Sequence, residues 1–171
     1  MAEVDVEQDY ELPALPRWRP WAAFALSIIG FGISMYLTID HFQGVAPICS
    51  SQGFVNCKLV TESTYSYILK IPVSLLGLLF FTAMVGINFP PLWRARAQWV
   101  AVARLAMAVS GICFVLYLLA AELFSIKAIC LWCTGVHITT FFLFALIVAS
   151  FPLVSSRAAA LEYWAEGGDG A

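Results

Sequence analysis

Four long apolar runs limit what this chain can fold into. They cover residues 21–39, 72–89, 100–121 and 130–151. Each is close to the roughly 20 residues that an α-helix needs to cross the hydrocarbon core of a bilayer. Hydrophobic residues make up 61% of the chain and charged residues only 12%, about half the charged share of a soluble domain. The sequence therefore predicts an all-α integral membrane protein, a bundle of four transmembrane helices.

The remaining segments and the charge narrow the function classes. Residues 1–19 are acidic and interrupted by prolines, which predicts a disordered N-terminal tail. Residues 152–171 form a C-terminal tail that is too short for a second folded domain. The net charge of −2 and the 9 Lys and Arg residues give no basic stripe. We therefore expect a lipid bilayer around the chain and no nucleic-acid partner.

Basic residues predict the orientation of the four crossings. Those on the two tails and on the link between the second and third runs are Arg17, Arg19, Arg94, Arg96 and Arg157. Those on the other two links are Lys58, Lys70 and Lys127. Because the cytoplasmic loops of membrane proteins are enriched in Lys and Arg, this imbalance predicts that both tails are cytoplasmic. Residues 40–71 then form an outward, extracytoplasmic loop between the first and second helices.

Four of the five cysteines form two close pairs. Cys49 and Cys57 lie in the outward loop, and Cys130 and Cys133 open the fourth run as C-L-W-C. On a helix the second pair shares one face, one turn apart. The free N–H groups and positive dipole at a helix start favour a thiolate, so we expect a lowered pKa for at least one of the two. Since the fourth run starts on the loop's side, all four cysteines can meet where disulfides persist.

Two such pairs form a plausible relay, because a thiolate of one can attack a disulfide of the other. The loop pair can reach a soluble protein, while the helix pair faces the bundle. The chain has no Gly-rich dinucleotide fingerprint, so a quinone fits best as a lipid-soluble two-electron acceptor.

Other interpretations of the pairs stay open. One is a soft-metal carrier, since paired thiolates also suit Cu(I) or Hg(II). Another is a structural membrane subunit in which a disulfide between Cys49 and Cys57 pins the loop. A zinc site is weaker, because His41 and His137 lack close ligand spacing to either pair, and we predict no metal site.

Several single residues carry weaker signals. His137 lies one turn beyond Cys133, and an ionisable residue inside a membrane span is a functional candidate. The alternative is a histidine hydrogen-bonded to a neighbouring helix. Cys113 is predicted to be a small apolar packing residue in its helix. Gly30 and Gly32 predict close helix packing.

The ordered combination of these motifs resembles the vitamin K epoxide reductase (VKOR) family. The resemblance rests on C-S-S-Q-G-F-V-N-C from Cys49 to Cys57, on Ser63, on the I-P-V-S-L-L-G segment that enters the second run, and on C-L-W-C. It implies a VKOR-like four-helix domain over residues 20–151 of a short bacterial homologue without a fused thioredoxin domain. Such homologues sit in the inner membrane, oxidise an extracytoplasmic thioredoxin-fold protein of the DsbA type and reduce a quinone, menaquinone or ubiquinone.

The resemblance also implies a catalytic role for each paired cysteine. Cys49 would exchange disulfides with the partner protein. Cys57 would pass electrons to Cys130 through a transient disulfide. Cys133, deeper along the helix, would lie next to the quinone. The implied activity is that of a quinone-dependent thiol–disulfide oxidoreductase that supports disulfide bond formation.

The quinone-binding residues follow from the same resemblance. Ser63 matches a family serine near the quinone pocket, and His137 occupies a position where family members carry a polar side chain close to a quinone oxygen. A hydrogen-bond donor there would stabilise the developing negative charge. The chain departs from the family at Val73, where members often carry an Asn that holds a quinone carbonyl. Because Val cannot do so, either Ser74 or His137 is expected to substitute, or the quinone sits differently.

Overall fold

The computed structural model of the chain describes residues 15–49, 53–94 and 98–165. Its helices are α1 (Trp18–Gln43), α2 (Cys57–Thr61), α3 (Val73–Ile87), α4 (Gln98–Ala120) and α5 (Leu131–Ala165). Shorter elements are the 3-10 turns η1 (Thr64–Ser66) and η2 (Pro90–Arg94), the π-helical turn η3 (Ala121–Ile126), and strands β1 (Tyr67–Ile68) and β2 (Ile71–Pro72). Three helical segments, α1, α4 with η3, and α5, are long and apolar enough to cross a membrane, and α3 is a shorter apolar helix. A mostly helical, multi-pass membrane protein is confirmed.

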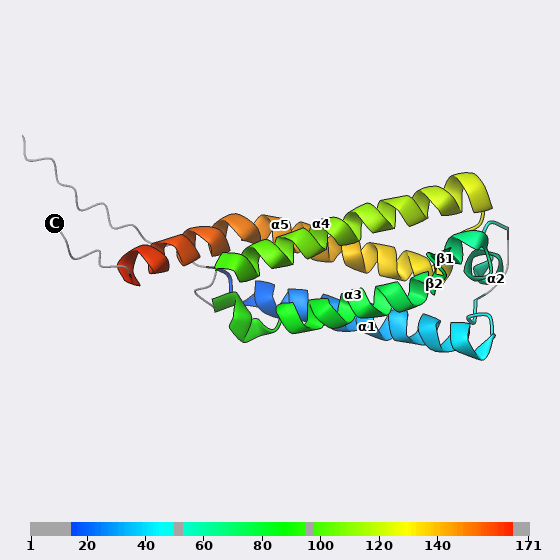
Figure 1. Cartoon of the computed structure of the whole chain (residues 1–171), viewed down its shortest axis with the longest axis horizontal. Coiled ribbons are helices and arrows are strands. Elements are labelled where there is room, and N and C mark those ends of the chain that lie inside the picture. Colours follow the sequence, from blue (N-terminus) through cyan, green and yellow to red (C-terminus); the bar gives the residue numbers. More distant parts are fainter. Residues whose placement is uncertain (1–14, 50–52, 95–97, 166–171) are drawn as a thin grey trace, which may run out of the picture.

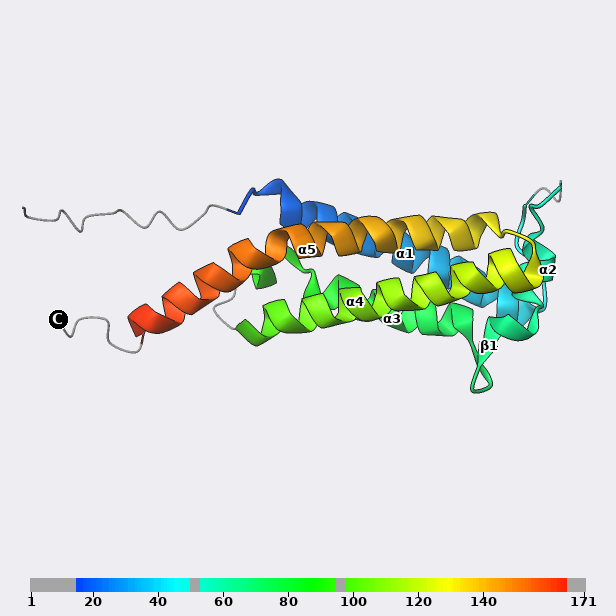
Figure 2. The same cartoon turned by 90° about the horizontal axis from the view of Figure 1, so that it is seen from above.

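Helices α1, α3, α4 and α5 run side by side along the long axis of the molecule (Figures 1 and 2). α1 packs on α3 and α5, α4 packs mainly on α5, and α3 and α4 contact each other less closely. The start of α1 and the end of α5 share one end of the bundle, here called the tail end (Figure 2). α2 and the β-strands lie at the opposite end, the loop end. The loop and the start of α5 therefore meet at the loop end.

α5 continues well past the predicted end of the fourth apolar run. We expected a helix over 130–151 and a tail from 152, but the helix passes through Pro152 and ends at Ala165. Ala158, Ala159 and Ala160 are the strongest helix formers, which explains the extension. Figure 2 shows α5 bending away from the bundle in this part, as a proline inside a helix favours. Residues 1–14 and 166–171 of the two predicted tails lie outside the described residues.

α1 also exceeds its predicted range of 21–39. It starts at Trp18, inside the predicted tail, and ends where Gly44 adopts a left-handed conformation with φ 66°. The N–H groups of Gly44 and Val45 bond the carbonyls of His41 and Asp40, at 3.2 and 3.0 Å. This capping pattern satisfies the last carbonyls of the helix. Asp40 and His41 consequently belong to α1 and not to the loop 40–71.

The third run ends in an unexpected turn. We expected a helix over 100–121 and a plain connection from 122, but η3 continues α4 as a π-helical turn. Lys127, with φ 56°, ends the turn. Glu122 lies within it and is only 4% exposed. The carboxyl group of Glu122, which the sequence placed in a plain connection, is thus buried inside the protein.

The loop contains a small β-hairpin that the all-α prediction does not include. β1 and β2 pair antiparallel, with Ile68 opposite Ile71. Leu69 and Lys70 at the tip have φ of 51° and 67°, the double positive φ of a type I′ turn. Strands of two residues are too short for an alternating pattern to reveal them. α3 follows at once, over 73–87 in place of the predicted 72–89.

The main core of the bundle lies between the long helices. Its buried members are Ala23, Phe81, Met84, Trp93, Ala101, Ala108, Leu143, Ile147 and Val154. Gly30 of α1 lies directly against the Phe81 ring of α3, in space that a Cβ atom would occupy. A Cβ on Gly32 would meet nothing within 4 Å. Gly30 therefore allows the close packing of α1 and α3, whereas Gly32, predicted to do the same, faces outward.

This contrast gives a matched pair of variants for stability. Gly30→Ala forces Phe81 (1% exposed) out of its packed position, and we expect a loss of about 1–3 kcal/mol. Gly32→Ala should leave stability within about 1 kcal/mol of the wild type, since Ala favours helix over Gly. Thermal unfolding in detergent, followed by tryptophan fluorescence, compares the two. Equal midpoints for both variants would contradict this packing.

Candidate active site

The loop is held against the start of α5 by main-chain hydrogen bonds. The N–H of Ile129 donates to the carbonyl of Phe54 at 2.8 Å, and the carbonyl of Ile129 accepts from the N–H of Asn56 at 3.0 Å. These bonds form a short parallel bridge between two distant parts of the chain. Asn56 directly precedes Cys57, and Ile129 directly precedes Cys130. The bridge therefore brings one cysteine of each pair to the same place.

Two aromatic side chains hold the loop on the other side of the disulfide. The indole Nε1 of Trp132 donates to the carbonyl of Ile48 at 3.0 Å, and the N–H of Ile48 donates to the Tyr36 hydroxyl, also at 3.0 Å. The rings of Tyr36 and Trp132 lie 4.7 Å apart. The main chain just before Cys49 is thereby fixed to both α1 and α5. Sequence reasoning missed both aromatics, although Trp132 lies inside the C-L-W-C motif.

All four paired cysteines lie in one apolar cluster at the loop end. Cys57 and Cys130 are 1% and 0% exposed, and Cys49 and Cys133 pack against them. Cys49 and Cys57 form a disulfide with a Cα–Cα distance of 6.2 Å, while Cys130 and Cys133 are free thiols. The two pairs are therefore neighbours in the protein interior.

Cys130 directly precedes the first residue of α5, where main-chain N–H groups are unpaired. Its Sγ accepts a hydrogen bond from the N–H of Cys133 at 3.4 Å. The Cys133 thiol, followed by the N–H groups of Cys133 and Trp132, lowers the pKa of Cys130 to about 7, although burial acts in the opposite direction. The lowered pKa expected for this pair is found at Cys130, which is substantially ionised at neutral pH and fit for disulfide exchange.

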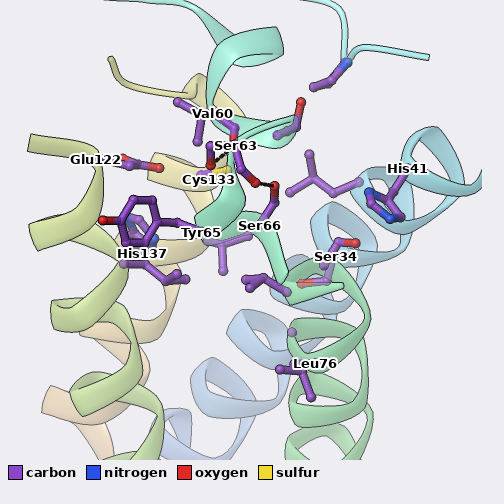
Figure 3. Close-up of a pocket in the computed structure, with 18 of the residues that line it drawn as sticks. Ser34, His41, Val60, Ser63, Tyr65, Ser66, Leu76, Glu122, Cys133 and His137 are labelled. Atoms are coloured by element: carbon purple, nitrogen blue, oxygen red, sulfur yellow. Dashed lines mark hydrogen bonds between the residues drawn. The ribbon is translucent and has the colours of Figure 1, made fainter. Parts of the chain in front are cut away.

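A cavity of about 430 Å³ adjoins the cluster, between the loop and the long helices (Figure 3). Cys133 lines it, and so do the three residues predicted to bind quinone, Ser63, Ser74 and His137. Val73 contributes an apolar side chain to the same wall. The volume lies within the range of small-molecule sites, which are mainly apolar with a few polar groups.

The polar atoms of this cavity suit a ligand that carries hydrogen-bonding oxygens. The Ser63 hydroxyl donates to the carbonyl of Val60 at 2.8 Å, which leaves its oxygen free to accept. Ser74 Oγ and His137 Nδ1 are buried and have no partner within the described part of the chain. A buried polar atom left unpaired costs about 1–3 kcal/mol, which a ligand's polar group would recover. These residues fit a quinone ring with its two carbonyls.

The structure places the other candidate residues as follows. His41 Nε2 lies 3.2 Å from the Tyr67 hydroxyl, where α1 meets the hairpin. Cys113 is exposed on α4, so the packing role predicted for it is wrong. Over residues 15–49, 53–94 and 98–165, no group of three or more His, Cys, Asp or Glu side chains is arranged to hold a metal ion. Glu122, which also lines the cavity, was not predicted as a site residue.

The chain also matches a known family. Residues 21–148 fit the model of the vitamin K epoxide reductase family, a stretch that holds both cysteine pairs and all the residues that line the cavity. The chain belongs to the vitamin K epoxide reductase family. No curated protein matches it. Family membership and the Cys49–Cys57 disulfide identify this VKOR-family chain as a membrane disulfide oxidoreductase.

The low pKa of Cys130 can be tested by titration. In the reduced protein, thiolate absorbance should grow as the pH rises through about 7, because the folded environment favours the ionised form. Cys133→Ala removes the largest stabilising contact and should shift this titration to higher pH. Cys113→Ala, which removes an exposed thiol on α4, is the control and should leave it in place. An unchanged titration in Cys133→Ala would contradict the assigned cause.

Proposed function

We propose that this VKOR-family protein is a quinone-dependent thiol–disulfide oxidoreductase. It reoxidises an extracytoplasmic thioredoxin-fold protein of the DsbA type, passes two electrons to a membrane quinone, and so supports disulfide bond formation. The observation that carries the proposal is the bridge between Asn56 and Ile129, which joins the two cysteine pairs beside the cavity. A loop disulfide that served only to pin the loop would have no need of a second, buried thiol pair against it.

The first half of the cycle moves a disulfide outward. A thiolate of the partner attacks Cys49, which is less buried than Cys57, and a mixed disulfide forms as Cys57 leaves as a thiolate. The partner's second thiol then attacks the mixed disulfide and displaces Cys49. The partner dissociates with a new disulfide between its own two cysteines. The loop pair now holds the two electrons that the partner has lost.

The second half moves these electrons into the bundle. The Cys57 thiolate attacks Cys130 of an oxidised helix pair, and Cys133 leaves as a thiolate. Cys49 then displaces Cys130 from Cys57, which restores the loop disulfide and leaves two helix thiols. This is the redox state of the described structure, with a Cys49–Cys57 disulfide and free Cys130 and Cys133.

The last step oxidises the helix pair, Cys130 and Cys133, back to a disulfide. A bound quinone, menaquinone or ubiquinone, supplies an acceptor for two electrons and two protons. Ser63, Ser74 and His137 would hold and orient its ring beside Cys133. A donor from His137 toward a quinone oxygen would stabilise the negative charge that develops there.

We further propose four membrane crossings, with both termini in the cytoplasm and the loop end on the extracytoplasmic side of a bacterial inner membrane. The exposure of Trp18, Trp21 and Trp99 supports a membrane–water interface at the tail end, since such side chains favour that interface on either side of a membrane. Trp93 is an exception, because it is buried with the Arg104 guanidinium 4.1 Å from its ring centre. The alignment of α3 with α1 supports α3 as the fourth crossing (Figure 1).

A reconstituted assay tests the proposed activity. Purified protein in detergent, a reduced DsbA-like protein and a soluble quinone analogue should give partner-dependent loss of quinone absorbance. Cys133→Ala should abolish it, because the helix pair can no longer form its disulfide. Cys113→Ala should retain wild-type activity. If the wild type consumes no quinone with any thiol donor, the proposal fails, and titration with Cu(I) then tests the soft-metal alternative.

A further inference from the structure

Glu122 is a buried carboxyl group that the electron path above does not use. Its side chain is 4% exposed, and it lines the cavity together with Cys133 and His137. Figure 3 shows the three side chains on the same side of the cavity. Its Oε2 atom is buried and has no hydrogen-bond partner among the residues that the structure describes. Because a buried carboxylate without a partner is strongly unfavourable, this position calls for an explanation.

The π-helical turn η3 ties Glu122 to the cysteine cluster. The N–H of Ala128 donates to the main-chain carbonyl of Glu122 at 3.3 Å, and Ala128 is itself a buried member of the cluster. Ile126, at the end of the same turn, packs against that cluster. The carboxyl group lies close enough to interact electrostatically with both Cys130 and Cys133. π-Helical turns are rare and occur frequently at functional sites.

We propose that Glu122 is the proton-transfer residue of the quinone step, accepting a proton from the Cys133 thiol and delivering it to the bound quinone. This inference rests on the proposed function. Its physical basis is charge balance, since a thiolate and a carboxylate close together in a buried site repel each other strongly. Moving one proton between Cys133 and Glu122 creates the thiolate while the total charge of the site stays the same.

The step balances in atoms and electrons. Two S–H bonds break and one S–S bond forms between Cys130 and Cys133, so the sulfurs release two electrons and two protons. Both electrons and two protons end on the quinone as two O–H groups. Glu122 carries one proton and returns to its carboxylate form. The proton of Cys130, whose pKa is about 7, exchanges with water at neutral pH, and water supplies the second O–H proton.

Other titratable groups around the cavity are less suited to this role. They are Asp40 and His41 of α1, Glu62 after α2, Tyr65 of η1, Tyr67 of β1 and His137 of α5. Glu62 is exposed to water, and the His41 ring already contacts the Tyr67 hydroxyl. His137 is buried like Glu122, but as a neutral ring that gains a proton it would add a positive charge to the site. Asp40 Oδ2 is also buried without a partner in the described part of the chain, but the electrostatic interaction with Cys130 and Cys133 is found at Glu122.

The first test measures the protonation of the Glu122 carboxyl group directly and needs no quinone. Infrared difference spectra between the oxidised and the dithiol-reduced full-length protein should contain a carboxylic acid C=O band, because Glu122 gains a proton when a thiolate forms beside it. The band should disappear in Glu122→Gln. Glu62→Gln makes the same chemical change at an exposed position and should keep it. A wild-type band that persists in Glu122→Gln would overturn the proposal.

The second test is kinetic. Glu122→Gln should lower kcat for quinone reduction about 100-fold, the order that proton transfer by a positioned side chain contributes, with KM nearly unchanged. Glu122→Asp, which retains a carboxyl group, should recover part of the loss, while Cys113→Ala, at an exposed position outside the cavity, should match the wild type. A wild-type kcat in Glu122→Gln would overturn the role.

Misfolding and failure of the proposed function are distinguishable from failure of this role. Formation of the Cys49–Cys57 disulfide and a cooperative thermal transition show that each variant is folded. If Glu122→Gln does not fold, Glu122→Asp shows whether the band belongs to residue 122. The carboxylic acid band should then shift in frequency from its wild-type position, and an unshifted band would overturn the proposal. If the wild type reduces no quinone, the proposed function fails on that result alone, whereas the infrared band still reports whether Glu122 takes up a proton from the dithiol.

Discussion

The bridge between Phe54–Asn56 and Ile129 is the interaction on which this site depends. Cys57 and Cys130 are far apart in sequence, and two main-chain hydrogen bonds, of 2.8 and 3.0 Å, align the residues that precede them. Because main-chain bonds do not depend on side-chain identity, this alignment tolerates sequence change around the cysteines. The bonds of Trp132 and Tyr36 to Ile48 fix the loop on the far side of Cys49. The loop disulfide is thus held in place without a covalent link to α5.

The site divides its chemistry between two environments. Cys57 and Cys130 are almost fully buried among apolar side chains. Cys133 borders the cavity, whose wall also holds polar atoms of Ser74, His137 and Glu122 that have no hydrogen-bond partner among the described residues. Electron exchange between sulfurs and proton transfer to a ligand can therefore take place on neighbouring surfaces. Cys133 is the residue that the two surfaces share.

The sequence predicted the parts of this arrangement that follow from composition and spacing. Uncharged runs revealed the helices, and the two cysteine pairs revealed the redox chemistry. Tyr36 and Glu122 could not be recognised, because the hydrogen bond of Tyr36 to the loop and the place of Glu122 in the cavity wall arise only when separate elements fold together. The extension of α5 beyond Phe151 was missed because a hydrophobic pattern marks the membrane span and not the end of the helix. The hairpin tip at Leu69 and Lys70 lacks the Gly or Asn that usually signals such a turn.

The most direct test of the account asks whether the two pairs exchange disulfides through Cys57 and Cys130. In the double variant Cys49→Ala/Cys133→Ala, each pair keeps one thiol, and mild oxidation followed by peptide mass spectrometry shows whether the two become linked. The account predicts a Cys57–Cys130 disulfide in most of the protein and no link to the exposed Cys113. Free Cys57 and Cys130 after the same oxidation would contradict it.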